Sequence, residues 1–373
     1  MWHLSLQLDH TRDYLHFSNF YFDPIDPAHS NLPTYFTRLI TDYCAPTFSF
    51  LAGLSAFFVG RRKNTGQLSG FLFKRGLWLV FIEITFVSFA WYFNIRFRNV
   101  DLAVIWTLGI SMIVLAGLVH LPKKIILALS LIVIFGHNLL DTVHYNGSIL
   151  WGLIHEPHSF KLSENFILTI DYPVVPWIGV MALGYCFGPL YDRSYDAAKR
   201  KRFLNILGVS TIALFLIVRG INSYGDPLSW QHYDTGTKKL MSFLNVNKYP
   251  PSLCYVLMTL GPALLFLANS EKLKGWLVDF FSVFGRVPFF YYILHLYLIH
   301  IIAMLLAQLT GFGWRIMLLN NWLSEEPKLK GYGVSLGLVY LIWISVILLL
   351  YPLCKKFDEY KQGHKEQWWL SYL

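Results

Sequence analysis

The sequence has 373 residues, of which 55% are hydrophobic and only 14% are charged, and its mean hydropathy is +0.45. Soluble domains carry about 25% charged residues, so this composition excludes an ordinary soluble protein and indicates an integral membrane protein. The net charge of +9 comes from short basic clusters beside apolar runs, which is typical of membrane topology rather than of a nucleic-acid surface.

Apolar segments recur along the whole chain. Residues 1–9 form a stub that is too short to cross a bilayer, so either the first helix begins unusually late or the start at Met1 removes its first half. Nine further segments approach or exceed the roughly 20 residues that a spanning helix needs: 35–60, 70–94, 101–121, 123–142, 173–191, 203–222, 251–269, 286–310 and 333–353. The sequence therefore predicts an all-α, polytopic membrane helix bundle with about 9–10 spanning helices, the first one truncated, in a single domain over residues 1–373.

The polar connections alternate in character and predict an orientation. One side carries most of the Lys and Arg in short stretches such as "RRKNTGQLSG" and "DRSYDAAKRKRF", together with the tail 354–373. The positive-inside rule makes this side cytoplasmic, and the C-terminus with it. Residues 271–284, "EKLKGWLVDFFSVF", are predicted to form an amphipathic helix along the same surface.

The opposite side has four long loops that are rich in Trp, Tyr, His, Asn and Asp. They cover residues 9–34, 143–172, 223–250 and 311–332. Long loops of this kind are often functional, and aromatic and polar side chains together suit sugar-like ligands. The alternative is that the aromatic residues form the interfacial belt of a membrane protein.

The four cysteines predict neither a disulfide framework nor a metal site. They lie far apart, in or beside apolar segments, with no CxxC pair and no His/Cys spacing typical of zinc: Cys44, Cys186, Cys254 and Cys354.

Several ionisable residues fall within the predicted spans, where a charge costs roughly 2.5 kcal/mol or more. Glu83 is interpreted as a structural partner for a neighbouring helix, or as a functional group. His137 and Asp141 are four residues apart and share a helix face, so they form either an outer-end ligand site or proton relay, or a pair that holds two helices. Arg219 lies near the outer end of its helix and can extend toward the interface.

The segment "FGRVPFFYYILHLYLIH" carries Arg286, His295 and His300. The two histidines are five residues apart, which places them about 140° apart on a helix. We therefore expect them not to serve one site together. Each is interpreted as a separate core histidine, although His295 is also a candidate for lining a pathway.

The densest ionisable cluster is "LDHTRDYLH" at the end of the N-terminal stub. On a continued helix His10 and Asp13 share a face, and a carboxylate beside an imidazole orients it and raises its basicity. Asp13 is thus the expected orienter of His10, with Asp9 approaching from another side. The alternative is a salt-bridged helix end in which Arg12 lies between the two aspartates.

Long stretches of the chain resemble one known family. The run "LDHTRDYLH…FDPIDPAHSNLPTYFTRLITDYCAPTFSFLAGLSAFF", with "RGLWLVFIEIT", "VPWIGVMALGYCFG", "INSYGDPLSW" and "FGRVPFFYYILHLYLIH", resembles an uncharacterised bacterial branch of the heparan-α-glucosaminide N-acetyltransferase-like family. The resemblance implies a bacterial inner-membrane acyltransferase. It implies that cytosolic acetyl-CoA, the co-substrate, donates its acyl group to an extracytoplasmic amino sugar or cell-envelope glycan, with no metal.

The resemblance also guides the choice of site residues. The family's key histidine lies near the outer end of the first helix and its loop, a region that holds both His10 and His29; we favour His10, oriented by Asp9 and Asp13. The basic residues at the cytoplasmic ends are candidates for binding CoA, or only topology signals: Arg61, Arg62, Lys63, Lys123 and Lys124. Candidates for the acceptor side are Arg12, His16, His29, His137, Asp141, Arg219 and Asn222.

Two other functions compete with an acyltransferase. A small-solute transporter or channel would use His137, Asp141, Glu83 and His295 as path residues, although no internal repeat is visible. A non-catalytic membrane scaffold would not bind CoA at all. The sequence identifies neither the acceptor nor the acyl chain, and analogy with the family is compatible with a homodimer.

Overall fold

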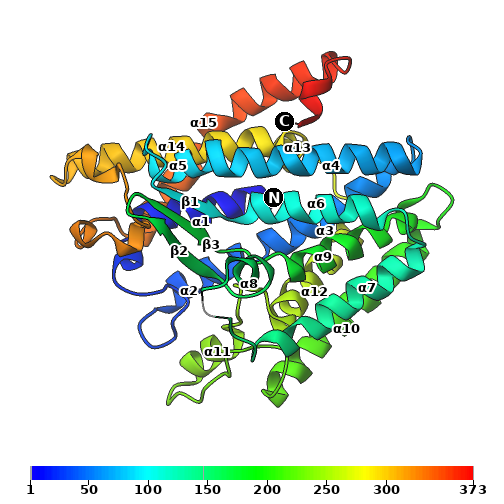
Figure 1. Cartoon of the computed structure of the whole chain (residues 1–373), viewed down its shortest axis with the longest axis horizontal. Helices are drawn as coiled ribbons and strands as arrows, with labels where there is room; N and C mark the ends of the chain where they lie inside the picture. The colour runs from blue at the N-terminus through cyan, green and yellow to red at the C-terminus, as the bar shows by residue number, and fades with distance from the viewer. Residues whose placement is uncertain (1, 146, 373) are drawn as a thin grey trace. The chain divides into compact units, whose positions relative to one another are not determined.

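The computed structural model describes residues 2–145 and 147–372, and Figure 1 traces the chain. The chain forms two compact units. Unit 1 consists of Met1–Cys44, Thr85–Val100 and Leu273–Leu373, and unit 2 consists of Ala45–Ile84 and Asp101–Lys272. The single domain over residues 1–373 stays a prediction.

The described residues of unit 1 form six α-helices, which come from three separate parts of the chain. They are α1 (Trp2–Leu15), α2 (Leu32–Thr41), α5 (Ser88–Tyr92), α13 (Trp276–Arg286), α14 (Pro288–Leu309) and α15 (Leu336–Gly363). The start of α2 is fixed by Asn31, whose side chain accepts a hydrogen bond from the Thr34 backbone N–H, and by Pro33 in the first turn. Short 3-10 turns connect several of these helices, including η1 (Phe17–Phe20), η5 (Trp314–Met317) and η6 (Leu323–Glu325).

The two ends of the sequence meet in unit 1, where α1 packs against α14 and α15. Leu4 joins an apolar cluster with Phe284, Leu350 and Cys354, and the Trp343 indole N–H donates to the Leu4 carbonyl at 2.7 Å. At the other end of α1 the Val334 N–H donates to the Leu15 carbonyl at 2.7 Å. Apolar contacts and hydrogen bonds thus hold α1 at both ends.

Unit 2 contains the remaining α-helices of the described chain. They are α3 (Cys44–Gly60), α4 (Thr65–Ile82), α6 (Val104–Leu118), α7 (Lys123–Gly136), α8 (Ile149–Ile154), α9 (Val175–Cys186), α10 (Ala197–Ile221), α11 (Gly236–Leu244) and α12 (Leu253–Ser270). Asn64 and Gln67 form a capping box that starts α4. Asp196 caps α10 and Ser252 caps α12.

Glycines allow helices of unit 2 to pack at backbone contact. A Cβ on Gly53 of α3 would lie 1.9 Å from the Met181 carbonyl oxygen of α9, and one on Gly184 of α9 would lie 2.0 Å from the Phe50 oxygen of α3. In the same way, a Cβ on Gly76 of α4 would lie 2.5 Å from the backbone oxygen of Gly109 in α6. Small residues at crossings of this kind are typical of helix packing in membranes.

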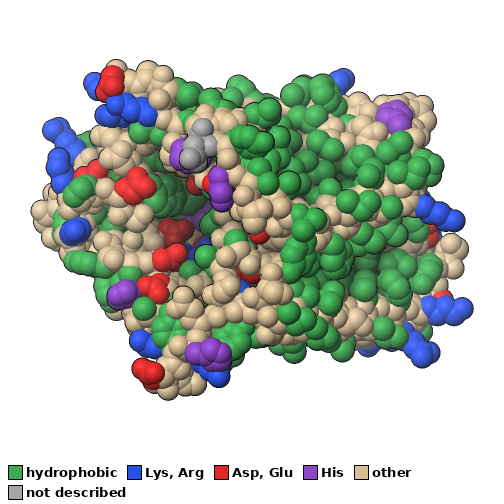
Figure 2. Space-filling view, turned by 60° about the horizontal axis from the view of Figure 1, so that its bottom comes forward, with side chains coloured by type: hydrophobic (Ala, Val, Ile, Leu, Met, Phe, Trp, Pro, Cys, Tyr) green, Lys and Arg blue, Asp and Glu red, His purple; other side chains and the backbone are tan. Residues whose placement is uncertain are grey.

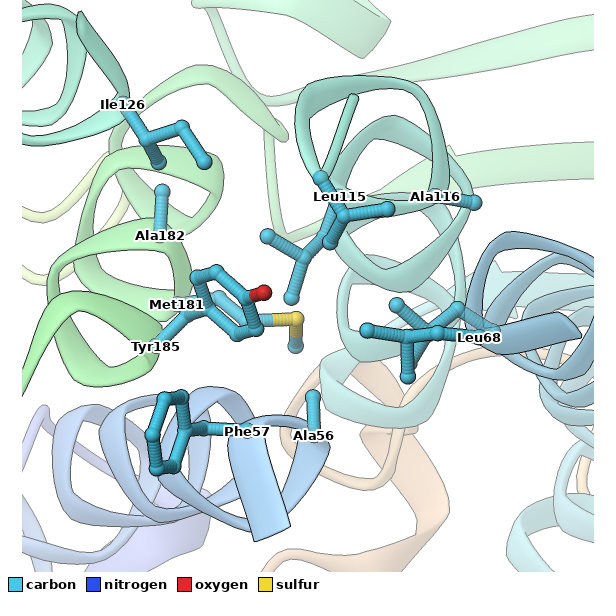
Figure 3. Close-up of a cluster of buried hydrophobic side chains, with 11 residues drawn as sticks. Ala56, Phe57, Leu68, Leu115, Ala116, Ile126, Met181, Ala182 and Tyr185 are labelled. Carbon is cyan, nitrogen blue, oxygen red and sulfur yellow. The ribbon is translucent and has the colours of Figure 1, made fainter. Parts of the chain in front are cut away.

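An apolar core fills the space between α3, α4, α6, α7 and α9 (Figure 3). Its buried side chains come from all five helices: Ala56, Phe57, Leu68, Leu72, Leu115, Ala116, Val119, Ile126, Met181, Ala182 and Tyr185. The rings of Phe57 and Tyr185 lie near Met181 (Figure 3) and meet edge-on, at an interplanar angle of 69° and a centroid distance of 6.0 Å. This core and the glycine contacts make unit 2 a closely packed bundle.

The predicted loop 143–172 contains a small β-hairpin that the sequence analysis did not anticipate. Strands β2 (His158–Ser163) and β3 (Phe166–Ile170) pair antiparallel, and His158 lies opposite Ile170. Leu102, the last residue of β1 (Asn99–Leu102), accepts backbone hydrogen bonds from Asp171 and Tyr172. Phe160 and Ile170 are buried with Leu102 in a separate apolar cluster.

Among the described residues, six helices have the length and apolar composition to cross a membrane: Leu32–Gly60, Lys123–Leu140, Ala197–Ile221, Leu253–Ser270, Pro288–Leu309 and Leu336–Gly363. The protein is therefore an integral membrane protein with a polytopic, mainly α-helical architecture. Apolar side chains cover much of the face in Figure 2, and large apolar residues such as Ile132 and Leu348 are exposed.

Fewer described helices meet this length and composition than the nine to ten spans expected from the sequence. The expected spans 101–121 and 173–191 are shorter helices, because α6 ends at Leu118 and α9 at Cys186. The expected span 70–94 is divided into α4, a π-helical turn at Glu83–Val87, and α5. The amphipathic helix expected at 271–284 is α13, which exposes Trp276 and Leu277 and buries Val283 and Phe284.

The glycine contact between α3 and α9 can be tested by adding one methyl group. We expect Gly53→Ala to lower the stability of the detergent-purified protein by about 1–3 kcal/mol or more, because the added carbon meets a backbone carbonyl that cannot rotate away. Gly70→Ala is the matched control, since nothing lies within 4 Å of a Cβ there and alanine favours a helix by up to about 1 kcal/mol. Equal melting temperatures for the two variants would contradict the packing described here.

Candidate functional site

A pair of buried histidines links α1 and α14 in unit 1. The His10 Nδ1 lies 2.9 Å from the His295 Nε2, and the two residues are only 6% and 1% exposed. The edge of Trp91 in α5 faces the His10 ring at a centroid distance of 4.8 Å, and Tyr292 lies 6.0 Å away. The chain thus places an imidazole pair inside an aromatic enclosure, shielded from solvent.

Polar contacts continue along the same helix face on both sides of this histidine pair. Toward the start of α1 the Tyr291 hydroxyl donates to the Gln7 side-chain oxygen. Toward its end the Tyr14 hydroxyl donates to the Trp91 carbonyl at 2.6 Å and lies 3.1 Å from the His300 Nδ1. Positions 7, 10 and 14 recur at helical spacing, so one face of α1 presents a stripe of polar side chains to the helices around it.

His295 and His300 have separate contacts, and their expected role as separate core histidines stays a prediction. Their spacing on α14 does turn them apart, but both have partners on α1, His295 through His10 and His300 through Tyr14. His300 is also held by two carbonyl oxygens, that of Ala90 at 2.7 Å and that of Met317 at 2.8 Å. These contacts give His300 a structural position between three segments.

The carboxylates near His10 form the salt-bridged helix end that the sequence offered as the alternative to an orienter of His10. Arg12 Nη2 lies 2.7 Å from Asp9 Oδ1 and 2.6 Å from Asp13 Oδ1. The orienter expected for His10, Asp13, is thus bonded to Arg12, while His10 pairs with His295. The reason is geometric, because Arg12 reaches between successive helical turns, whereas His10 faces α14.

A second arginine from α2 completes this Asp/Arg cluster, which consists of Asp9, Arg12, Asp13, Arg38 and Asp42. Arg38 forms a close ion pair with Asp42 and lies 3.6 Å from Asp9 Oδ2, and the Thr41 hydroxyl donates to Asp9 at 2.8 Å. Arg12 is only 2% exposed, and its Nε and Nη1 have no hydrogen-bond partner among the described residues. The cluster fixes the end of α1 and leaves two buried guanidinium donors that a ligand could use.

The other two histidines of this region differ in exposure. His16 is 2% exposed and its Nδ1 lies 2.5 Å from the Ser18 hydroxyl. Burial, with the nearby positive charge of Arg12, lowers the pKa of His16 to about 4. His29 has a side chain that is 66% exposed and pairs with Asp26 on the surface. Of the two candidates for the key histidine, His10 lies in an enclosed polar site and His29 lies on an open loop.

In unit 2 the predicted pair of His137 and Asp141 is divided between other partners. The His137 ring lies 2.8 Å from the Pro251 carbonyl and 3.0 Å from the Val133 carbonyl. Asp141 instead binds the His155 Nε2 at 2.9 Å and accepts from the Asn138 amide at 2.8 Å. These bonds tie the end of α7 to neighbouring segments.

His155 was missed by the sequence analysis. It is 3% exposed, and its Nδ1 has no hydrogen-bond partner among the described residues. The only sequence signal was its place in the aromatic stretch "HYNGSILWGLIHEPH", and no spacing rule relates it to Asp141 across 14 residues. A small pocket in the same loop is lined by Tyr145, Trp151, Glu156 and His158.

Arg219 and Asn222, candidates for the acceptor side, hold their own loop. The buried Arg219 guanidinium donates to four backbone carbonyls, those of Phe243, Leu228, Ser242 and Asn245. Asn222 makes two hydrogen bonds to the Trp230 backbone. Their bonds therefore organise the segment 223–250.

Glu83 and Arg286, which the sequence predicted to be charges within spans, have structural partners and lie outside the six candidate spanning helices. Glu83 accepts from the backbone N–H groups of Ala103 and Trp106 at 3.3 and 3.2 Å, so it caps the start of α6. Arg286 donates to Asp358 at 2.7 Å and joins α13 to α15.

The basic candidates for CoA binding lie at the ends of α3 and α7 in unit 2. Arg61 pairs with Asp192 at 3.2 Å, and the Lys123 ammonium lies 4.6 Å from the Phe57 ring centroid. Arg62, Lys63 and Lys124 are exposed. A further basic contact was not predicted: Arg200 donates twice to Glu271, at 2.7 and 2.6 Å, and these bonds lower the pKa of Glu271.

The described residues contain no group of three or more His, Cys, Asp or Glu that could hold a metal ion.

The fold and the buried histidine pair together define a multi-helix membrane protein with an enclosed polar site in its N-terminal helix. The family model described as heparan-alpha-glucosaminide N-acetyltransferase, catalytic, matches residues 15–223. The match covers more than half of the chain, and the protein belongs to this family of membrane acetyltransferases. No curated protein and no solved structure matches. His10 and His295 both lie outside the matched segment.

The Asp/Arg cluster predicts a strong dependence on Arg12. Arg12→Leu leaves the buried Asp9 and the half-buried Asp13 without their closest counter-charge, and we expect a loss of about 3–5 kcal/mol or failure to fold. Lys161→Leu is the control, because it removes an exposed pair with Glu164 whose contribution is at most about 1 kcal/mol. Thermal unfolding of both detergent-purified variants measures the difference, and equal stability would rule out a structural role for the cluster.

The lowered pKa of His16 predicts a pH dependence of stability. Because the folded-state pKa of about 4 lies below the ordinary value of 6.5, the unfolded chain binds a proton first as the pH falls. The contribution of neutral His16 is therefore complete above pH 6.5 and is lost progressively toward pH 4. We expect the melting temperature of the wild-type protein to fall more steeply over this range than that of His16→Gln. Parallel curves would show that His16 does not titrate in this way.

Proposed function

We propose that this protein transfers an acetyl or other short acyl group from a CoA thioester to an amino or hydroxyl group of a sugar. Membership of the acetyltransferase family supports the reaction class. The observation that carries the assignment to a site is the buried contact between His10 and His295 in an aromatic enclosure. An imidazole in such a site is suited to proton transfer or to acyl transfer.

In the proposed reaction His10 acts as general base. The acceptor nitrogen or oxygen attacks the thioester carbonyl and gives its proton to His10, the carbon–sulfur bond breaks, and the CoA thiolate takes that proton back. The products are an acylated acceptor and CoA–SH, so atoms and charge balance. In the alternative route His10 itself carries the acyl group between the two substrates, and the same products result.

The Asp/Arg cluster supports this reaction in two ways. It fixes the end of α1 that carries His10, through ion pairs from α1 itself and from α2. The buried Nε and Nη1 of Arg12 are donors to which acceptor hydroxyls can bind. Asp9 and Asp13 are thus proposed to act through Arg12 rather than on the imidazole.

The sequence supports a location in a bacterial inner membrane with the C-terminus in the cytoplasm. Under this orientation the basic connections, including Arg61 and Lys123, face the cytosolic CoA, and the loops rich in aromatic residues face the acceptor. The acceptor is then an extracytoplasmic amino sugar or envelope glycan.

His10→Ala tests the proposed role directly. We expect it to abolish acetyl transfer from acetyl-CoA to glucosamine, because no base or carrier remains, while the protein stays folded in detergent. His29→Ala is the matched control, since it removes an exposed histidine of the same region and should leave transfer intact. Product formation is followed by mass spectrometry.

The outcomes separate the two histidines. Full activity of His10→Ala with loss in His29→Ala would transfer the role to the exposed loop. Full activity in both variants would remove histidine chemistry in this region from the mechanism.

A further inference from the structure

The hydrogen bonds around His295 fix which of its nitrogens carries the proton. Its Nδ1 lies 2.9 Å from the Tyr291 backbone carbonyl, and a carbonyl oxygen can only accept a hydrogen bond. In neutral His295 the proton is therefore on Nδ1, and Nε2 carries the lone pair. The backbone of α14 itself sets this state, because residues 291 and 295 are one helical turn apart.

The same reasoning extends to His10. The only ring nitrogen of His295 that can accept is Nε2, and it faces the His10 Nδ1 at 2.9 Å. His10 must then donate through Nδ1–H, which leaves the lone pair of a neutral His10 on Nε2. A chain of donors and acceptors from the Tyr291 carbonyl through His295 thus determines the tautomer of a histidine 285 residues away in sequence.

We infer that His295 is a positioning residue that holds His10 in the Nδ1-protonated tautomer, with Nε2 as the atom that takes the acceptor's proton. This inference rests on the proposed function only for its consequence in the reaction. The tautomer itself follows from the two contacts. No other buried histidine of α14 is placed in this way, since His300 has carbonyl oxygens on both ring nitrogens.

The aromatic neighbours support a fixed ring rather than a mobile one. The Trp91 ring meets the His10 ring at an interplanar angle of 77° and Tyr292 at 73°, so they enclose it from its sides. The His295 ring lies nearly parallel to the His10 ring, at 13°. Rotation of His10 would break its bond to His295 and bring the ring against these neighbours.

The contact with His295 also stabilises the positively charged form of His10 that arises during the proposed reaction. When His10 Nε2 takes a proton from the acceptor, Nδ1–H keeps donating to His295 Nε2, and the bond becomes charge-assisted and stronger. The proton leaves again from Nε2 to the CoA thiolate. His295 thus stays neutral throughout, and no further proton carrier is needed.

The tautomer can be measured without any substrate. Nitrogen-15 NMR of histidine-labelled wild-type protein distinguishes protonated from unprotonated ring nitrogens, and His10→Gln identifies the His10 signals. We expect His10 with a protonated Nδ1 and an unprotonated Nε2. A protonated Nε2 in neutral His10 would overturn the inference, whatever the activity of the protein.

Substitutions at His295 test its consequence. His295→Leu removes the acceptor, and we expect kcat to fall by about 100-fold or more with KM little changed, since a positioned general base contributes about 10²–10⁴-fold. His295→Gln offers a side-chain oxygen that accepts from Nδ1–H, and we expect it to recover most of that loss. Equal activity of the Leu and Gln variants would overturn the positioning role.

His300→Leu is the matched control for damage to α14. It also removes a buried histidine from that helix, but one that does not contact His10. We expect a lower melting temperature, with kcat of the folded protein retained.

The outcomes for the proposed function and for this inference can be told apart. If His10→Ala is inactive while both His295 variants are fully active, only this inference fails. If wild-type protein transfers no acyl group, the proposed function fails and the NMR result alone decides the tautomer. If His295→Leu does not fold, the NMR result on wild-type protein still decides the tautomer of His10.

Discussion

The packing of α1 against α14 depends on a line of buried polar contacts, and the hydrogen bond between His10 and His295 lies in the middle of this line. The two rings lie in the aromatic enclosure formed by Trp91 and Tyr292, where an unpaired polar group costs about 1–3 kcal/mol. The helices that carry the rings must therefore approach closely and in one register. The same register brings the Tyr291 hydroxyl to Gln7 and His300 to Tyr14. Satisfying these polar groups together therefore fixes how α1 lies against α14.

The two polar systems of α1 have separate roles because Arg12, which binds the carboxylates, lies about 160° around the helix from His10. The Asp/Arg cluster gathers around Arg12 and takes Arg38 from α2, whereas His10 faces the aromatic side chains and His295. Carboxylates held by guanidinium groups stabilise a fixed helix end, and the imidazole pair stays available for proton transfer. A single helix thus carries both the support and the reactive group of the proposed site.

Much of the architecture could be predicted from the sequence, but the partners of the site residues could not. Apolar runs and low charge predicted a helical membrane protein, and the quoted motifs predicted the family. The sequence placed His10 on a helix but assigned it to Asp13, because local rules see only residues three or four apart. Its partner, His295, lies 285 residues away, a contact that only tertiary packing creates. The β2–β3 hairpin was missed because its strands are only six and five residues long and lie within a polar loop.

The most direct test of the acyltransferase account is to incubate the detergent-purified protein with carbon-13-labelled acetyl-CoA and glucosamine, and to follow both products by mass spectrometry. The account predicts that labelled N-acetylglucosamine and free CoA form in equal amounts with wild-type protein, and that neither forms with His10→Ala. Release of CoA without labelled sugar, or equal product from both proteins, would contradict it.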